Sequence, residues 1–260
     1  MKLAASNIAC EPEHSLRIYR AMADNGFSGL EAAPGKFFAG DPYGTIKQAK
    51  IFAESLKASC GLEICSLQSI WYGQRFRIVE SAEARRRLLT QTQHVIELSD
   101  NIGCRNIVFG CPRNRAVDKP EDIPIVEDFL LKCADMADWF GIVIALEPNP
   151  TIYHTNFVNT TEQALALLKK LNHPALKLNL DFGTVIVNHE SLDWIREDSA
   201  WIHHVHISEP NLVAIREREE HKQLLHLLKE SGYDGYVSIE TTDAGSITDA
   251  IKYVGGLASS

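Results

Sequence analysis

Four residues whose side chains could bind a cation or move a proton each end a short apolar run. Glu147 follows IVIAL, Asp181 follows ALKLNL, His206 follows IHHV and Glu240 follows YVSI, at steps of 34, 25 and 34 residues. Three carboxylates and one imidazole brought to one place would repel one another unless a cation lay between them. If the fold gathers these side chains, the sequence predicts a divalent metal site.

The spacing of these residues points to the elements that would have to position them. A (β/α)8 barrel divides 260 residues into units of about 32, close to the observed steps. Apolar runs alternate with helical patterns, which favours βαβ units and a parallel sheet. Strands are predicted over 2–9, 27–34, 62–70, 105–112, 142–148, 176–183, 201–208 and 236–241. Helices are predicted over 11–25, 44–59, 81–102, 120–140, 160–171, 190–197, 218–231 and from 246.

The predicted fold is therefore α/β, as a single (β/α)8 TIM barrel domain over residues 1–260. A doubly wound open sheet is the alternative, but no Gly-x-Gly-x-x-Gly motif follows the first predicted strand to support it. In a barrel the C-terminal strand ends converge on one mouth, where catalytic residues gather. The four residues on neighbouring strand ends should therefore meet.

Alternation along the predicted strands places further polar residues inside the barrel. Side chains at i and i+2 share a face, so Asn179 lies beneath Asp181 and His204 lies beneath His206, while His203 is predicted to face the helices. Barrel interiors are usually filled by branched apolar side chains. Asn179 and His204 are therefore predicted to orient the metal ligands through hydrogen bonds.

The composition limits the partners and the compartment. A formal charge of −8 and a pI near 5.7 disfavour nucleic acid and anionic membrane surfaces. No apolar stretch approaches the roughly 18 residues of a membrane span, and the N-terminal residues lack the pattern of a secretory signal. The six cysteines are scattered with no Cys-x-x-Cys pair, which favours reduced thiols and a cytoplasmic location.

The sequence around the four residues resembles a known group of enzymes. L-E-P-N-P at Glu147, N-L-D-F-G at Asp181, H-V-H-I-S-E-P at His206 and S-I-E-T at Glu240 are similar to the four-ligand pattern of the xylose-isomerase-like sugar phosphate isomerase/epimerase superfamily. The superfamily includes ketose 3-epimerases, hydroxypyruvate isomerase and inosose isomerase. The resemblance covers essentially the whole chain. It implies that all four residues bind one Mn2+, Mg2+ or Co2+ ion and that Glu147 and Glu240 are catalytic.

The chemistry of the residues agrees with that expectation. Three carboxylates and one imidazole suit Mn2+ or Mg2+ better than a structural zinc ion, and Mn2+ is the ion we expect. A cation on the carbonyl and adjacent hydroxyl of a small carbohydrate stabilises a metal-bound enediolate. Glu147 and Glu240 on either side could move a proton between its faces. Return to the opposite face gives epimerisation and return to the same face gives isomerisation, and both remain open.

Other residues near the predicted mouth are candidates for substrate contact. Arginines there could bind a phosphate or carboxylate, with solvated loop side chains as the alternative. Those arginines are Arg75, Arg77, Arg113 and Arg115, and the predicted substrate-binding residues are Glu31, Gln68, Trp71, Asn149 and His154.

The sequence departs from the ketose 3-epimerase pattern at three positions. Those enzymes tend to have a His where this chain has Thr184, an Arg where it has Leu212 and a Glu where it has Tyr153. The groups lost in this way hold substrate oxygens in those enzymes. A substrate other than a free hexulose is therefore expected.

Other functions remain as alternatives on the same scaffold. A metal-dependent lyase, such as an inosose or dehydroshikimate-type dehydratase, would use the same residues to expel a β-hydroxyl. DNA repair of the endonuclease IV type needs many more histidines and a basic groove, and only two of the ten histidines lie in the first half. A sugar-binding barrel without catalysis would not need both glutamates. A homo-oligomer is compatible with the sequence.

Overall fold

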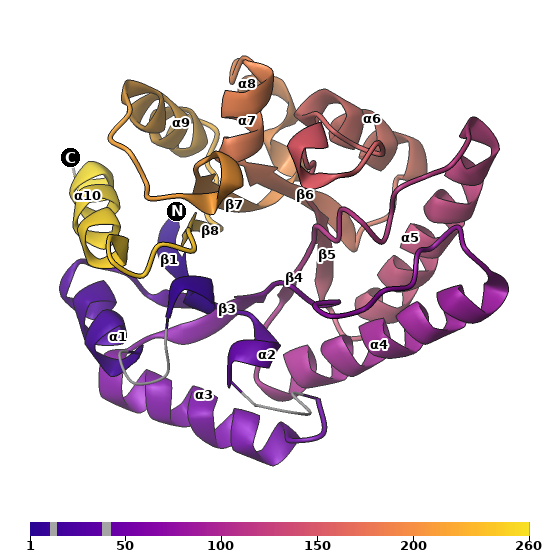
Figure 1. Cartoon of the computed structure of the whole chain (residues 1–260). Coiled ribbons are helices and arrows are strands. Elements are labelled where there is room, and N and C mark those ends of the chain that lie inside the picture. Colours follow the sequence, from indigo (N-terminus) through magenta and orange to yellow (C-terminus); the bar gives the residue numbers. More distant parts are fainter. Residues whose placement is uncertain (11–14, 38–42, 260) are drawn as a thin grey trace.

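A closed barrel of eight parallel strands forms the centre of the molecule, in a computed structural model that describes residues 1–10, 15–37 and 43–259. The strands follow one another around the barrel in sequence order, and β1 pairs with β8 to close it (Figure 1). This arrangement confirms the predicted (β/α)8 fold. The strands are β1 (Lys2–Ser6), β2 (Gly29–Ala32), β3 (Glu63–Leu67), β4 (Asn106–Phe109), β5 (Val143–Leu146), β6 (Leu176–Asp181), β7 (Ile202–Ser208) and β8 (Tyr236–Glu240).

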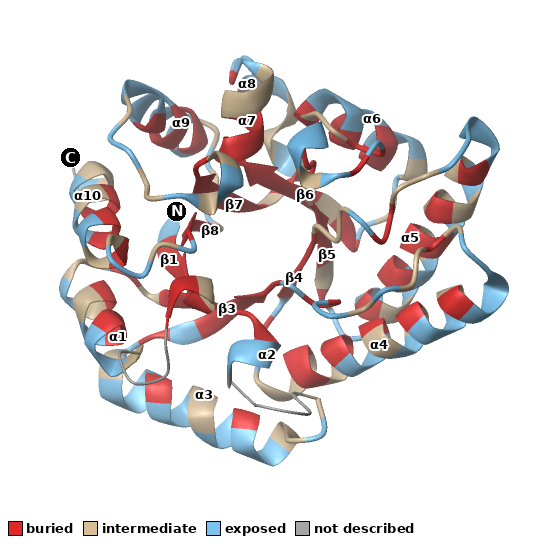
Figure 2. Cartoon of the chain, in the orientation of Figure 1, coloured by how far each residue is buried: buried red, intermediate tan, exposed pale blue. Residues whose placement is uncertain are grey.

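A ring of helices surrounds the strands. Buried residues line the side of each helix that faces the barrel and exposed residues lie on the outside (Figure 2). The helices are α1 (Ser15–Asp24), α2 (Pro34–Phe37), α3 (Ile46–Cys60), α4 (Ala82–Asn101), α5 (Ile123–Asp138), α6 (Thr161–Leu171), α7 (Phe182–Asn188), α8 (Ile195–Asp198), α9 (Glu219–Glu230) and α10 (Ile247–Ser259). Among the described residues, none of these helices is long and apolar enough to cross a membrane.

Local signals in the sequence explain where several helices begin and end. Ser81 caps α4 by accepting a hydrogen bond from the Ala84 amide at 3.0 Å, and Thr160 caps α6 in the same way. Gly61 follows α3 with φ of 68°, a conformation that glycine adopts without a side-chain penalty. The caps at Ser81 and Thr160 fix helix starts on the side of the mouth, and Gly61 fixes the turn from α3 into β3.

Two short helices depart from the sequence prediction. α2 lies inside the loop that follows β2, and α7 begins directly after β6, where the sequence suggested a continuing strand. The predicted short helix over 190–197 is present only as α8, from Ile195 to Asp198. The start of the helix predicted over 11–25 lies outside the described residues, and its remainder is α1.

An irregularity between β6 and β7 changes the direction of one side chain. Leu178 pairs with Ile202, but Asn179 pairs with His204, so His203 is an additional residue in β7. Such a bulge re-aims a side chain. His203 lies 2.8 Å through Nδ1 from Oδ1 of Asn106 on β4, and the prediction that it faces the helices is wrong.

Candidate metal centre

The four residues singled out by the sequence meet at the C-terminal mouth of the barrel. Glu147 directly follows β5, Asp181 and Glu240 end β6 and β8, and His206 lies within β7. One ligand atom from each lies within 4.8 Å of the others. His206 Nδ1 is 2.9 Å from Glu147 Oε1 and 3.3 Å from Glu240 Oε2. The strand ends therefore present three carboxylates around one imidazole nitrogen.

Asp181 is held by groups at the start of α7. Its Oδ2 accepts hydrogen bonds from the Thr184 amide at 2.7 Å and lies 2.8 Å from the Thr184 hydroxyl, so the carboxylate also caps the helix. The Ser208 hydroxyl donates a short hydrogen bond to Oδ1, and the Gly183 amide donates to that hydroxyl at 2.8 Å. A β-carbon at Gly183 would lie 2.7 Å from the Ser208 hydroxyl, so glycine is required for this contact.

Glu147 is held from below by a buried arginine. The Arg115 guanidinium donates to the Glu147 main-chain oxygen at 2.7 Å and to Asn149 Oδ1 at 3.0 Å. The Asn149 amide in turn donates to Glu147 Oε2 at 2.8 Å. A β-carbon at Gly110 would lie 2.6 Å from the same oxygen. The glutamate therefore occupies a fixed position against the β4 strand end.

The electrostatics of the four residues show that negative charge is crowded at the mouth. Burial, together with the charges of Glu147 and Asp181, raises the pKa of Glu240 to about 7. Burial and the charge of Glu147 also raise the pKa of Asp181. Burial opposes ionisation of Glu147 as well, but its hydrogen bond and charge interaction with His206 hold its pKa below the usual value. Without a cation, one imidazole must balance three carboxylates.

The donor set fits a divalent cation. Three carboxylates and one imidazole nitrogen converge within 4.8 Å, and oxygen-rich sets with one nitrogen suit Mn2+, Mg2+ or Co2+. A bound cation would favour the charged form of Asp181 and Glu240 and so offset the cost that raises their pKa values. The structure contains a cluster of possible metal ligands, and it leaves the identity of the metal open.

A cavity of about 730 Å3 opens directly above the cluster. Glu147, Asp181 and Glu240 lie in its wall, as do four of the five predicted substrate-binding residues: Gln68, Trp71, Asn149 and His154. Many polar atoms of these four already have protein partners. Gln68 bonds to Ser6 and Ser69, Asn149 bonds to Glu147 and Arg115, and the Trp71 indole donates to Thr92. His154 is exposed on the rim and remains the freest of the four.

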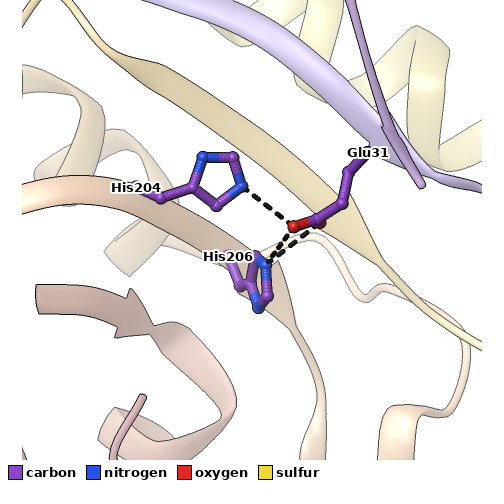
Figure 3. Close-up of side chains that lie close together, drawn as sticks. All are labelled: Glu31, His204 and His206. Carbon is purple, nitrogen blue, oxygen red and sulfur yellow. Dashed lines mark hydrogen bonds and ion pairs between the residues drawn. The ribbon is translucent and has the colours of Figure 1, made fainter. Parts of the chain in front are cut away.

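Glu31 lies away from the cavity. Its side chain is fully buried inside the barrel, one layer below the mouth, and faces His204 and His206 (Figure 3). The structure therefore gives Glu31 contacts with a candidate metal ligand in place of the substrate contact expected from the sequence. Asn179 and His204 lie in the interior as predicted, and the Asn179 amide donates to Glu147 Oε1 at 2.8 Å.

The four arginines near the mouth differ in their surroundings. Arg77 forms a two-pronged ion pair with Asp118, and Arg115 is buried beneath Glu147, where burial lowers its pKa to about 10. Arg75 and Arg113 are exposed and lie in the cavity wall, and neither forms an ion pair with a described residue. These two side chains can therefore reach a ligand in the cavity.

The three residues that differ from the ketose 3-epimerase pattern lie in different parts of the site. Tyr153 and Leu212 line the cavity, and the Tyr153 hydroxyl accepts a hydrogen bond from the Asn211 amide at 2.9 Å. Thr184 is buried beneath Asp181 and does not line the cavity. Its hydroxyl contacts Asp181 and the Pro148 carbonyl, so this residue supports a candidate ligand.

Sequence reasoning missed several residues that shape the site. Ser208 was detectable, because it lies two positions after His206 on the same face of β7. The role of Arg115 was not, since its contacts span more than 30 positions to Glu147 and Asn149. Gly110 follows β4 immediately, and a glycine at a barrel strand end could have indicated a close approach.

Comparison with known proteins identifies the family of this chain. Residues 19–255 match the family described as xylose isomerase-like TIM barrel. The chain belongs to this family. The superfamily suggested by the four sequence motifs is thereby confirmed.

Individual proteins are similar to this chain at 16–31% identity. Ketose 3-epimerase from Arthrobacter globiformis is 31% identical over 130 residues, which are 48% of this chain and 44% of that relative, so the match spans less than half of the relative's length. The apo crystal structure of 3-keto-D-glucoside 4-epimerase from E. coli is 21% identical over 100% of both chains, with a TM-score of 0.77. A structure of IOLI protein with a bound zinc atom is 16% identical over 99% of this chain and 96% of that chain, with a TM-score of 0.75.

Proposed function

We propose that this protein is a divalent-metal-dependent epimerase or isomerase of a small carbohydrate. One observation carries the proposal. Glu147 Oε1 and Glu240 Oε2 approach the same imidazole nitrogen from two different strands, at 2.9 and 3.3 Å, in the wall of a cavity large enough for a sugar. The named activities of the ketose 3-epimerase and the 3-keto-D-glucoside 4-epimerase support it.

The four residues would hold the cation, and the zinc atom in the IOLI structure supports metal binding on this scaffold. A cation there supplies Lewis acidity toward a carbonyl oxygen and its neighbouring hydroxyl. Asp181, fixed by Thr184 and Ser208, takes no part in proton transfer in this scheme. Its role is to bind and orient.

Glu147 and Glu240 would carry the proton. One carboxylate removes the proton from the carbon beside the carbonyl, so the C–H electron pair becomes a C=C bond and the carbonyl oxygen takes the negative charge of an enediolate. The other glutamic acid returns a proton to the opposite face of that carbon, which inverts it, and the carbonyl re-forms. Their positions directly after β5 and at the end of β8 suit an exchange between faces.

The wall of the cavity suggests the kind of carbohydrate. Arg75 and Arg113 have no ion-pair partner among the described residues and lie in the same cavity as the glutamates. A guanidinium binds a phosphate or a carboxylate through charge-assisted hydrogen bonds. We therefore propose a substrate with an anionic group, and the exposed ring of Tyr72 on the same rim could stack on its apolar face.

Metal binding is tested on the purified protein. Elemental analysis after incubation with Mn2+ should show one ion per chain, and His206→Ala should remove it. His226→Ala, at an exposed histidine on α9, is the matched control and should leave the stoichiometry unchanged. Unchanged binding in His206→Ala would refute the ligand assignment.

The activity is tested by a screen in D2O with Mn2+. Ketoses, hydroxypyruvate, inososes and sugar phosphates are incubated, and NMR is used to detect deuterium on carbon together with an inverted centre or a moved carbonyl. A product with new ultraviolet absorption would instead indicate the lyase alternative. If no carbohydrate exchanges its carbon-bound hydrogen in metal-loaded protein, the proposal fails.

A further inference from the structure

Glu31 is a fully buried carboxyl group that contacts two hydroxyls and two imidazoles. The hydroxyls of Ser66 and Ser238 donate to its two oxygens at 2.8 and 2.9 Å. Nε2 of His204 lies 3.2 Å from Oε1, and Nε2 of His206 lies 3.0 Å from Oε2 (Figure 3). Glu31 is therefore a fully buried carboxyl group that these contacts fix in position.

The two ring nitrogens of His206 face opposite directions. Nδ1 faces the mouth, near Glu147 and Glu240, and Nε2 faces Glu31 inside the barrel. An imidazole that binds a cation through one nitrogen must carry its proton on the other, and the partner of that other nitrogen decides which tautomer is present. An ionised carboxylate only accepts, so a proton on Nε2 is the state that fits Glu31.

Asn179 gives independent support for the same tautomer. Its Nδ2 lies 2.8 Å from Glu147 Oε1 and 3.1 Å from His206 Nδ1. The carboxylate oxygen requires an N–H donor, which fixes the amide orientation, and the same NH2 group then faces Nδ1 as a donor. The Asn179 amide is therefore a donor that suits a lone pair on Nδ1. A cation between Nδ1 and the carboxylates of Glu147 and Glu240 would use that lone pair.

We infer that Glu31 is a positioning residue that fixes the Nε2–H tautomer of His206 and so presents Nδ1 to the cation at the mouth. The inference rests on the proposed metal centre, because His206 must be a ligand for its tautomer to matter. A partner of this kind on a histidine ligand is worth about ten- to a hundredfold in metal affinity. Glu31, His204 and His206 do not need to form a second metal site, because Glu31 already accepts from two hydroxyls and lies 3.1 Å from His206 Nε2.

The test is the affinity of Glu31→Gln for Mn2+, measured by titration of the whole chain and compared with wild type. Glutamine keeps the size but replaces one acceptor by an NH2 group that faces hydroxyl and imidazole donors, so the dissociation constant should rise about ten- to a hundredfold. Glu31→Asp, which keeps the charge, should recover part of the affinity. Glu63→Gln is the matched control, since Glu63 begins the neighbouring strand β3 and contacts Tyr236 at the other end of the barrel.

A second measurement reports the tautomer directly. In protein labelled with 15N-histidine and loaded with diamagnetic Zn2+, the His206 signals should show a proton on Nε2 and none on Nδ1. Thermal unfolding of the metal-free variants separates a general loss of stability from a specific loss of affinity.

Each outcome decides one proposal. If wild type binds no Mn2+, the metal centre itself fails. If wild type binds and a folded Glu31→Gln binds equally well, or if the proton lies on Nδ1, the positioning role is refuted. Two ions per wild-type chain, with one lost in Glu31→Gln, would also overturn it, because Glu31 would then be a ligand of a second site.

Discussion

Two neighbouring layers of the barrel interior both combine carboxyl and imidazole groups, but they differ in electrostatic balance. The upper layer, formed by Glu147, Asp181, His206 and Glu240, places three carboxylates around one imidazole nitrogen. The lower layer is formed by Glu31, Ser66, His204 and Ser238. There a single carboxylate accepts from two hydroxyls and lies 3.0–3.2 Å from the imidazoles of His204 and His206.

The contrast shows in the acid–base properties of the two layers. In the upper layer, burial and like charges raise the pKa of Glu240 to about 7. In the lower layer, histidines hold the pKa of Glu31 down despite complete burial. A buried polar cluster whose charges are balanced is a structural unit, whereas one with excess negative charge needs a further positive partner. His206 belongs to both layers and links them.

The largest effect is expected from substitutions of the two glutamates in the upper layer that are proposed to carry the proton. Glu147→Gln and Glu240→Gln should each lower turnover by about a hundredfold or more, because an amide cannot exchange the proton. Metal content must be measured on the same samples, since both residues are also candidate ligands. Glu63→Gln, outside both layers, should retain wild-type turnover. A variant that kept its metal and near-normal turnover would show that its glutamate has no catalytic role.

Much of the upper layer was predictable from the sequence, and most of the lower layer was not. Each upper residue ends a recognisable apolar run, so the barrel fold alone brings Glu147, Asp181 and Glu240 together. The i, i+2 rule also placed His204 and Asn179 inside. The sequence places Glu31 at the mouth because it lies near the end of a predicted strand. The depth at which a side chain lies depends on how the strands are staggered, which short motifs do not encode.

The failed predictions of local structure have similar causes. VIV in α7 has the β-branched composition of a strand, yet Asp181 caps the helix and the packing of Phe182 and Val185 holds it. His203 points inward because of a bulge in the pairing of β6 with β7, and the bulge has no marker in the sequence. In both places, tertiary contacts override local preference.

The next prediction concerns the anionic group of the substrate. Arg75→Gln and Arg113→Gln should each reduce kcat/KM for a phosphorylated or carboxylated carbohydrate by about ten- to a hundredfold, because a charge-assisted hydrogen bond contributes roughly 1.5–3 kcal/mol. Arg77→Gln is the matched control, since its guanidinium is already paired with Asp118. Free fructose and tagatose should be poor substrates of the wild type. Their efficient 3-epimerisation would show instead that an ordinary ketose epimerase tolerates Leu212 and Tyr153.

A smaller expected effect concerns the packing beside Glu147 in the upper layer. Gly110→Ala would put a β-carbon 2.6 Å from Glu147 Oε2, so the carboxylate must move. Overpacking of this kind costs about 1–3 kcal/mol in the free energy of unfolding, and Mn2+ affinity should fall with it. Gly35→Ala, where nothing lies within 4 Å of the added carbon, is the control for both chemical denaturation and metal titration. Equal affinity and stability in the two variants would mean that Glu147 has room to shift.

The last prediction extends the comparison to an imidazole outside both layers. His206 faces carboxylates, which raise its pKa against the effect of burial, whereas His221 on α9 packs against Phe182 and Tyr253, and burial lowers its pKa from 6.5 to about 4. A histidine whose pKa is lowered by folding stabilises the protein above pH 6.5. That contribution is lost as the pH falls toward 4, because the unfolded chain then binds a proton that the folded chain does not. Between these values His221 should add about 1.4 kcal/mol per pH unit to the slope of the unfolding free energy against pH.

His221→Gln should remove that part of the slope, as measured by urea denaturation of the metal-free protein at several pH values. His226→Gln, at an exposed position on the same helix, should leave the slope unchanged. Equal slopes in wild type and His221→Gln would show that His221 gains a proton in the folded state as readily as in the unfolded chain.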